Sequence, residues 1–389
     1  MSDNVADASK GDIMIVDDTP VNLRLLSQML AEQGYHVRPV PDGPLALAAV
    51  RAESTDLILL DIRMPGMNGY EVCEHLKADA QTRDIPIIFI SALDAVQDKV
   101  KAFTAGGVDY VTKPFQVEEV LARVKTHLTL MRLQRQLKET NRKMVQELTL
   151  AGDVQASFLP HDLPNIPGWQ LAARLKPARE MSGDFYDFIC LPNRRLGIVI
   201  ADVCDKGAGA ALYMALSWTL IRTYAAEYPE QPENVLRAVN RRIIKDTTTK
   251  CFVTAFYGVL DLDTGMFVHC NAGHCWPCFI STHDSKRVRK VNNTGIPLGI
   301  FEDMTWEQGV VQFAPGDMLV LYTDGITEAR DSQGAFFGDD RLLEFLTTNL
   351  GYQTGAMPDA VLGEVQRFVG GLPQDDDIAL VVLSRDSVG

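Results

Sequence analysis

Carboxylates stand at the ends of hydrophobic runs in two separate parts of this sequence. In the C-terminal half there are four such acids: Asp184, Asp202, Asp324 and Asp376. Near the N-terminus three acids are placed in the same way: Asp17, Asp18 and Asp61. Carboxylates gathered at strand ends repel one another unless a cation lies among them, and hard divalent cations prefer oxygen ligands. The sequence therefore predicts two magnesium or manganese sites that are suited to phosphate chemistry.

Short apolar runs alternate with helical patterns in the first part of the chain. The expected strands have the sequences DIMIVDD, HVRPV, DLILLD, IPIIFISA and VDYVTKPF. Five strands alternating with helices predict a doubly wound parallel sheet in an α/β domain, whose ligands lie at the carboxyl ends of the strands. The polar side chains at these ends are Asp17, Asp18, Asp61, Ser91 and Lys113.

Residues 11–128 resemble the receiver domains of response regulators, through the motifs VDD, LLDIRMPGMNGYE, ISA and YVTKPF. The resemblance implies that Asp61 accepts a phosphoryl group and that Asp17 and Asp18 hold Mg²⁺ beside it. A carboxylate nucleophile needs such a cation to offset the charge of the phosphoryl group. Ser91 and Lys113 would contact the phosphoryl oxygens, and the resemblance makes Tyr110 the switch aromatic of the family. The implied phosphate donor is a sensor histidine kinase or a phosphotransfer protein.

The segment after the receiver has no proline between Pro114 and Pro160 and is rich in Leu, Gln, Lys, Glu and Arg. This composition predicts one long helix, with residues 129–155 as a helical linker. One heptad position would hold Leu130, Leu137, Met144, Ala151 and Phe158. The other seam position would hold His127, Gln134, Asn141, Leu148 and Gln155. This pattern favours a homodimeric coiled coil over a helix packed on its own chain.

Residues 156–389 change in character, because expected strands such as LGIVIADV, FVTAFYGVLDLD and DMLVLYTDG outnumber the helical patterns. This pattern predicts an α+β domain with two antiparallel sheets flanked by helices, and the ends of its strands would meet at one edge. The four C-terminal acids would be brought together there.

Residues 151–384 resemble the metal-dependent protein phosphatases, specifically the bacterial branch that acts in sigma-factor partner switching. The resemblance is carried by AGDVQASFLP, ADVCDKGAGAAL, NAGH, LYTDGITEA and DDIALVVL. It implies that Asp202 bridges two Mn²⁺ or Mg²⁺ ions, that the Val203 carbonyl binds one ion, and that Asp324 and Asp376 bind the other. Asp184 would be a ligand or would hold a bound water. The implied reaction removes phosphate from phosphoserine or phosphothreonine of a protein, such as an anti-sigma factor antagonist.

Two positions depart from this family pattern. Ser182 stands where a glycine usually precedes the GD pair, and Asp205 and Lys206 occupy the turn after Asp202, where small residues are more usual. A larger side chain in a tight turn could reshape the backbone that presents the Val203 carbonyl. Neither change removes an expected ligand.

The predicted function is a phosphatase under the control of Asp61 phosphorylation, whose sign the sequence leaves open. The alternatives are a catalytically silent adaptor that binds a sigma factor or its antagonist, and a dimerisation scaffold. A zinc site made by Cys270, His274, Cys275 and Cys278 is a weaker possibility than simple packing of these residues.

Bulk properties exclude several other classes. The net charge of −14 argues against nucleic acid as a partner. We expect no membrane association, because no apolar run approaches the roughly 20 residues that a membrane span requires. The polar start also lacks the apolar core of a signal peptide, so we expect a cytoplasmic protein whose seven cysteines are reduced. Residues 1–10 are expected to be a disordered N-terminus.

Overall fold

The computed structural model describes residues 9–92, 96–160, 162–248, 251–282, 288–291 and 295–387. The chain divides into two compact units, Met1–Arg142 and Lys143–Gly389, which we call the N-terminal and the C-terminal unit. Apart from Ser9 and Lys10, the segment that was expected to be disordered lies outside the described residues. Within the described residues, no helix combines the length and the apolar character that a membrane crossing needs.

The N-terminal unit is built on a five-stranded sheet with the order β2-β1-β3-β4-β5. All neighbouring strands in it are parallel, which confirms the predicted fold. Its elements are β1 (Asp12–Val16), α1 (Pro20–Glu32), β2 (His36–Val40), α2 (Gly43–Ala52), β3 (Leu57–Asp61), α3 (Gly69–Ala78), β4 (Ile87–Ser91), α4 (Val96–Thr104), β5 (Asp109–Thr112) and the start of α5 (Val117–Ala156).

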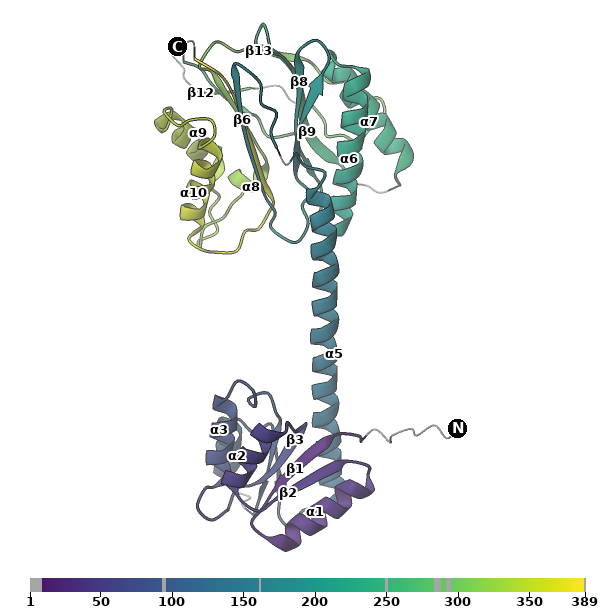
Figure 1. Cartoon of the computed structure of the whole chain (residues 1–389), viewed down its shortest axis with the longest axis vertical. Helices are drawn as coiled ribbons and strands as arrows, with labels where there is room; N and C mark the ends of the chain where they lie inside the picture. Colours follow the sequence, from purple (N-terminus) through teal and green to yellow (C-terminus); the bar gives the residue numbers. More distant parts are fainter. Residues whose placement is uncertain are drawn as a thin grey trace. The chain divides into compact units, whose positions relative to one another are not determined.

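Both faces of this sheet are covered, which explains why β3 and β4 are continuous apolar runs instead of alternating ones. Side chains of α2 and α3 pack on one face, and side chains of α1 and the start of α5 pack on the other (Figure 1). The loops at the carboxyl ends of the strands are left to carry polar side chains. A capping box, in which Asn68 and Glu71 bond each other's backbone N–H groups, begins α3 directly after the β3 loop.

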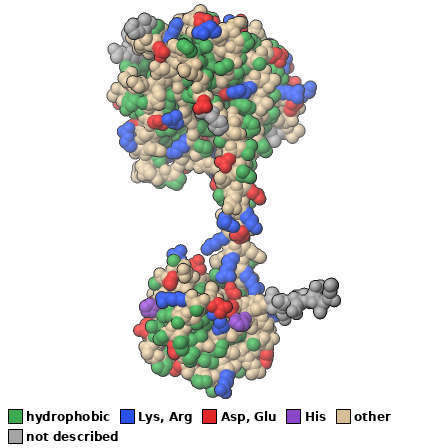
Figure 2. Space-filling view, viewed as in Figure 1, with side chains coloured by type: hydrophobic (Ala, Val, Ile, Leu, Met, Phe, Trp, Pro, Cys, Tyr) green, Lys and Arg blue, Asp and Glu red, His purple; other side chains and the backbone are tan. Residues whose placement is uncertain are grey.

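The linker prediction of one long helix is met by α5, which contains 40 residues. Val120, Val124 and Leu128 near its start are buried in the N-terminal unit. The middle of the helix is exposed and carries charged side chains of both signs beside apolar ones (Figure 2). Beyond Leu128, the large apolar residues of α5 that are exposed are Leu130, Leu133, Leu137, Met144, Val145, Leu150 and Val154.

The C-terminal unit consists of two five-stranded antiparallel sheets, as predicted, with the orders β13-β10-β9-β8-β7 and β12-β11-β14-β15-β6. Its strands are β6 (Trp169–Lys176), β7 (Phe185–Leu191), β8 (Arg195–Val203), β9 (Val253–Asp261), β10 (Met266–Ala272), β11 (Cys278–Ile280), β12 (Val288–Lys290), β13 (Gly309–Gln312), β14 (Met318–Tyr322) and β15 (Ile378–Arg385). Its helices after α5 are α6 (Ala208–Glu227), α7 (Pro232–Asp246), α8 (Asp324–Thr327), α9 (Gly338–Thr348) and α10 (Met357–Val369).

Four layers result from these elements, with α6 and α7 outside the first sheet and α9 and α10 outside the second (Figure 1). The inner faces of the two sheets meet in an apolar core that contains Phe256, Phe267 and Phe313. Strands β8 and β15 are buried on both faces, so they read as continuous apolar runs. This core places the start of β7 and the end of β8 opposite the end of β14 and the start of β15.

Candidate functional site

The first site lies at the carboxyl ends of β1, β3 and β5. The Nζ atom of Lys113 donates to Asp17 Oδ2 at 2.9 Å and to Asp61 Oδ2 at 2.8 Å. Asp17 also accepts from the Thr19 N–H at 2.8 Å and from the Asn22 amide at 2.9 Å. These bonds fix both buried carboxylates in one orientation. Burial by itself lowers the pKa of Lys113, but the two carboxylates outweigh this and raise it, so the lysine stays charged.

Carboxylate oxygens of Asp17, Asp18 and Asp61 all lie within 4.8 Å of one another. Burial raises the pKa of Asp61, and Lys113 only partly offsets this effect. Oxygen ligands at this spacing suit a hard cation such as Mg²⁺. The structure therefore brings together the three acids that the sequence singled out near the N-terminus.

The other two expected receiver residues belong to β4 and β5. Ser91 ends β4 and is buried, and its carbonyl accepts from the Lys113 N–H at 2.6 Å. Tyr110 lies in β5, where its ring meets Phe103 edge-on at a centroid separation of 6.1 Å. The guanidinium of Arg123 lies 5.6 Å from the centre of the Tyr110 ring.

The second site lies in the C-terminal unit, where the four acids come from the ends of strands in both sheets. Asp184 directly precedes β7, and Asp202 is the penultimate residue of β8. Asp324 follows β14 as the first residue of α8, and Asp376 lies two residues before β15. No three of these acids have ligand atoms within 4.8 Å of one another, since the N-terminal trio is the one such group among the described residues.

The electrostatics of the C-terminal acids show that they nevertheless share one environment. Burial, and then the charge of Asp202, raises the pKa of Asp184 well above its ordinary value. Burial and the charge of Asp324 raise the pKa of Asp202 to about 7. Burial and the charge of Glu328 raise the pKa of Asp324 to about 6. Within the described structure, the buried Oδ2 atom of Asp184 has no hydrogen-bond partner. An unpartnered carboxylate oxygen among repelling acids fits a divalent cation or its bound water.

The turn after β8 accommodates Asp205 and Lys206, which form one of the two departures from the family pattern. Asp205 has a φ of +76°, in the left-handed region that favours glycine. Its carboxylate accepts from the Lys206 N–H at 2.9 Å, and such local bonding lets an aspartate tolerate this conformation. Gly183 packs against the same turn, since a Cβ atom on it would lie 3.1 Å from the Val203 carbonyl oxygen.

The side chain of Lys206 reaches Asp376. Its Nζ atom lies 2.9 Å from Asp376 Oδ2 and donates to the Asp375 carbonyl at 2.8 Å. The sequence identified Lys206 only as an unusual residue in a turn. In the structure it is a cation held against one of the expected metal ligands.

Ser182 is the second position that departs from the family pattern. Its backbone is hydrogen-bonded by a residue of α5. The Ser182 hydroxyl accepts from the Asp184 N–H at 3.1 Å. The Ser182 N–H donates to Gln155 Oε1 at 3.0 Å, and the Ser182 carbonyl accepts from Gln155 Nε2 at 2.6 Å. The prediction that Gln155 continues a coiled-coil seam is therefore wrong, because its side chain is buried within the C-terminal unit. Phe158 lies beyond the end of α5 and packs on Trp218 at a ring separation of 5.4 Å, so it does not continue the seam either.

Asp377 is a further residue that sequence reasoning missed. Its carboxylate accepts from the Ala178 N–H at 2.7 Å and from the Gly183 N–H at 2.8 Å. It thus ties the loop before Asp184 to the start of β15. The run of three acids ending at Asp377 was the available signal, but the sequence does not show which acid of the run turns inward.

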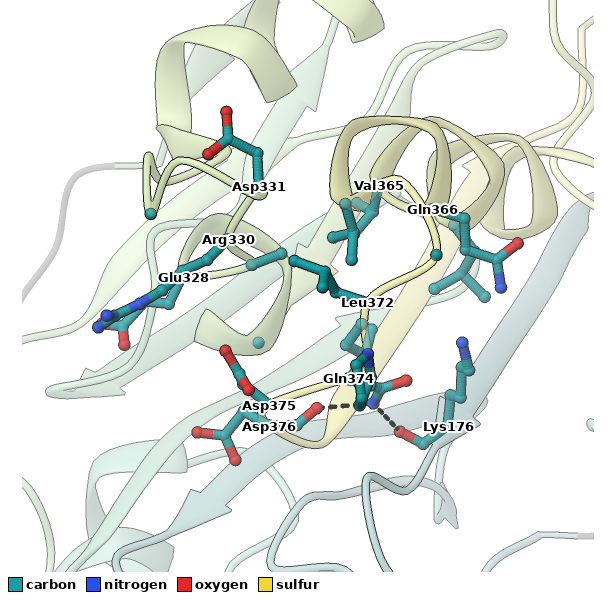
Figure 3. A pocket seen from close by; sticks show the side chains of 18 of the residues that line it. Lys176, Glu328, Arg330, Asp331, Val365, Gln366, Leu372, Gln374, Asp375 and Asp376 are labelled. Atoms are coloured by element: carbon teal, nitrogen blue, oxygen red, sulfur yellow. Dashed lines mark hydrogen bonds between the residues drawn. The ribbon is translucent and has the colours of Figure 1, made fainter. Parts of the chain in front are cut away.

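A cavity of about 860 Å³ adjoins Asp376, which lines its wall (Figure 3), and Lys206 and Gly325 also contribute to the lining. Val365 and Leu372 form an apolar part of the lining. The Gln374 amide shapes the floor by donating to the Lys176 carbonyl at 2.8 Å and to the Asp376 carbonyl at 2.6 Å. The volume is in the range typical of ligand pockets.

Cys270, His274, Cys275 and Cys278 do not form a group of described residues with three ligand atoms within 4.8 Å of one another, and Cys270 and Cys278 lie in two different apolar clusters. His274 is buried, and burial lowers its pKa to about 4, so its ring is neutral. Its Nδ1 atom lies 2.9 Å from the Thr254 hydroxyl. Cys270 and Cys278 pack in the apolar core of the C-terminal unit.

Two family models match the chain. The model described as "Response regulator receiver domain" matches residues 13–125, and the model described as "Stage II sporulation protein E (SpoIIE)" matches residues 192–386. The second match covers half of the chain and contains Asp202, Asp324 and Asp376.

Curated relatives match one or both parts. Protein IcfG of Synechocystis is 35% identical over 266 residues, which cover 62% of this chain and 42% of IcfG. The phosphoserine phosphatase RsbU of Bacillus subtilis is 32% identical over 265 residues, which cover 67% of this chain and 74% of RsbU. The DNA-binding regulator RpaA of Synechocystis is 43% identical over 116 residues, which cover 30% of this chain and 48% of RpaA. The chain thus spans less than half of the length of IcfG and of RpaA.

Two solved structures share the fold of the C-terminal unit. The SiaA-PP2C domain of Pseudomonas aeruginosa superposes with a TM-score of 0.56 at 19% identity, covering 64% of this chain and 98% of that domain. The RsbU and RsbW domains of a Mycobacterium tuberculosis protein give a TM-score of 0.51 at 24% identity, covering 60% of this chain and 64% of that one. At this level of identity they show the fold alone. The family matches show that the chain belongs to the Stage II sporulation protein E (SpoIIE) family and carries a response-regulator receiver domain ahead of the SpoIIE part.

Proposed function

We propose that this protein is a two-component response regulator whose output is the metal-dependent removal of phosphate from phosphoserine or phosphothreonine of another protein. The observation that carries the proposal is the group of acids with raised pKa values around the unpartnered Asp184 oxygen. Burying mutually repelling carboxylates costs stability, and bound cations remove that cost. The similarity to RsbU, which is named a phosphoserine phosphatase, supports the same chemistry.

Each acid has a proposed role toward two Mn²⁺ or Mg²⁺ ions. Asp202 would hold both ions, the Val203 carbonyl would hold one, and Asp324 and Asp376 would hold the other. Asp184 would serve as a ligand or hold a bound water. When bound, such ions lower the pKa of a coordinated water and polarise the phosphoryl group, so no nucleophile from the protein is needed. The chain orients these groups through the strand ends that carry them.

The cavity beside Asp376 supports a protein substrate. A phosphorylated side chain that reached the acids would place its neighbouring residues against Lys206 and the apolar wall at Val365 and Leu372. A phosphoserine-bearing anti-sigma factor antagonist is the substrate that we propose. RsbU, to which the chain is similar, is named a phosphoserine phosphatase.

The N-terminal unit supplies the input. We propose that Asp61 accepts a phosphoryl group from a sensor histidine kinase or phosphotransfer protein, with Mg²⁺ held by Asp17, Asp18 and Asp61. Lys113 already donates a hydrogen bond to Asp61. Once Asp61 is phosphorylated, the Lys113 ammonium would donate to a phosphoryl oxygen. In the same proposal Ser91 donates to another phosphoryl oxygen, and Tyr110 acts as the switch aromatic.

We also propose that the exposed part of α5 forms a parallel homodimer. Leu130, Leu137 and Met144 recur every seven residues and are all exposed. An apolar seam of this spacing is buried when two helices supercoil around each other. Introducing lysine at both Leu137 and Met144 should then yield monomers in analytical ultracentrifugation, whereas Gln136→Lys, at an exposed site off the proposed seam, should remain dimeric.

The test of the enzymatic proposal is hydrolysis of a phosphoserine peptide in the presence of Mn²⁺. We expect Asp202→Ala and Asp376→Ala to abolish turnover, while Asp303→Asn, at a carboxylate that is 88% exposed, should leave it unchanged. Calorimetry on the same proteins should show that Mn²⁺ uptake by the C-terminal unit is lost with Asp202→Ala. Metal uptake without any hydrolysis would instead favour a silent adaptor that binds a sigma factor or its antagonist.

A further inference from the structure

Cys204 and Cys251 lie at the ends of two neighbouring strands, with their Sγ atoms 2.7 Å apart. Cys204 directly follows β8, and Cys251 stands two residues before β9, which pairs with β8 in antiparallel fashion. The Cys204 N–H donates to the Phe252 carbonyl at 3.0 Å, and the Phe252 N–H donates to Cys204 Sγ at 3.0 Å. The backbone therefore holds the two thiols face to face.

Both residues carry free thiols and are partly exposed. A disulfide bond has a sulfur separation of about 2.05 Å, so the two atoms need to approach by only about 0.7 Å. The sequence alone could not show this, because the cysteines are 47 positions apart and only the pairing of β8 with β9 joins them.

We propose that Cys204 and Cys251 are an oxidation site at which hydrogen peroxide closes a reversible intramolecular disulfide. Each thiol gives up one hydrogen atom, the two sulfur atoms form the S–S bond, and the O–O bond of the peroxide breaks to give two molecules of water. A dithiol reductant reverses the step by thiol–disulfide exchange. This proposal stands on the geometry of the pair and does not depend on phosphatase activity.

A disulfide at this position would also affect the neighbouring acidic site at the end of β8. Asp202 and Val203, the proposed metal ligands of β8, immediately precede Cys204. A cross-link at Cys204 restrains the backbone that presents the Val203 carbonyl, and it closes a loop that contains α6 and α7. We therefore infer that oxidation stiffens this end of β8 and lowers metal-dependent turnover.

Oxidation that begins at Cys251 is expected to be slow. Burial, and then the proximity of Cys204, raises the pKa of Cys251 to about 12, and the thiolate is the reactive form of cysteine. The experiment therefore follows the reaction over hours, and a rate well below that of an activated thiol is part of the expected result.

The site is tested by treating the full chain with hydrogen peroxide, blocking the remaining thiols and mapping its peptides by mass spectrometry. We expect a peptide pair linked through Cys204 and Cys251 that dithiothreitol separates. The link should be absent from Cys251→Ser and retained in Cys190→Ser, which removes an exposed thiol on β7. Recovery of Cys204 and Cys251 as blocked thiols, as sulfinic acid or in links between two chains would overturn the proposal.

Two further measurements on the oxidised protein test the consequence. The melting temperature should rise by about 5 °C, because the cross-link restricts a long loop in the unfolded chain. Turnover of a small aryl phosphate with Mn²⁺ should fall at least fivefold, recover with dithiothreitol, and remain insensitive to peroxide in Cys251→Ser. If the linked peptide forms but turnover is unchanged, the inferred control of the β8 end is wrong.

Discussion

Gln155, in the last turn of α5, holds both backbone polar groups of Ser182 in one pair of hydrogen bonds. One turn earlier, Gly152 lies so close to this segment that a Cβ atom would be 2.0 Å from the Glu180 carbonyl oxygen. Ser182 in turn accepts from the Asp184 N–H. The end of the linker helix is thus in direct contact with the loop that presents an acid of the candidate site.

Replacing Gln155 with alanine should damage the site without touching any expected ligand. The substitution leaves the buried N–H and carbonyl of Ser182 without partners, which costs about 1–3 kcal/mol. We expect a lower melting temperature and a several-fold loss of Mn²⁺-dependent turnover. Gln136→Ala, at an exposed position of the same helix off the proposed seam, is the matched control and should behave as the wild type. Equal turnover in both variants would show that Asp184 does not depend on this contact.

Replacing Lys206 with methionine should strengthen the binding of Mn²⁺. The ammonium lies 2.9 Å from Asp376, so an incoming cation must displace it and then bear its repulsion. Removing one positive charge at this range is expected to raise the affinity about tenfold. Isothermal calorimetry measures the change directly, with Lys176→Met, at another lysine of the same cavity, as the control. Weaker binding in Lys206→Met would mean that the lysine supports the ligand instead of competing for it.

Asp202 and Asp324 should each contribute stability to the metal-free protein that is lost as the pH rises from about 4 to about 7. Their folded-state pKa values, near 7 and near 6, lie above the ordinary 3.8, so at these two acids the folded state binds more protons than the unfolded state in this window. The buried His269 and His274, whose pKa values burial lowers to about 4, act in the opposite direction. For Asp202 the effect is at most about 4 kcal/mol. Thermal melts in the presence of a chelator should show this loss as a difference, because the stability of the wild type relative to Asp202→Asn should fall as the pH rises, while His269 and His274 act equally in both proteins. Saturating Mn²⁺ should reverse the trend, since a bound cation favours the ionised acids.

The sequence predicted the structure best where apolar runs mark buried strands. The parallel sheet followed from apolar runs such as β3 and β4, and the grouping of Asp17, Asp18 and Asp61 followed from acids at the ends of such runs. Asp17 and Asp61 could be placed together because parallel strands end at a common edge. These inferences need only the local sequence and the rules of sheet packing.

The contacts that the sequence did not reveal all join residues that are distant in the chain. Lys206 pairs with Asp376, 170 positions away, and heptad counting could not show that Gln155 turns into its own unit at the end of α5. Asp377 and Asp376 are identical in type, and only the packing of β15 decides that Asp377 is the one that bonds the loop at Gly183. Such details depend on three-dimensional packing, which a pattern along the chain does not record.

Phosphorylation at Asp61 should change the output of the phosphatase domain. Beryllium fluoride with Mg²⁺ mimics a phosphoryl group on a carboxylate, and it would compete with Asp61 for the Lys113 ammonium that now lies 2.8 Å away. Couplings between sites are typically about 1–3 kcal/mol, so turnover of a phosphoserine peptide should change by several-fold to about a hundredfold. Asp61→Asn should show no response, and Gln155→Ala should show a smaller response than the wild type if the signal passes through α5. Equal turnover with and without beryllium fluoride in the wild type would rule out control by the receiver.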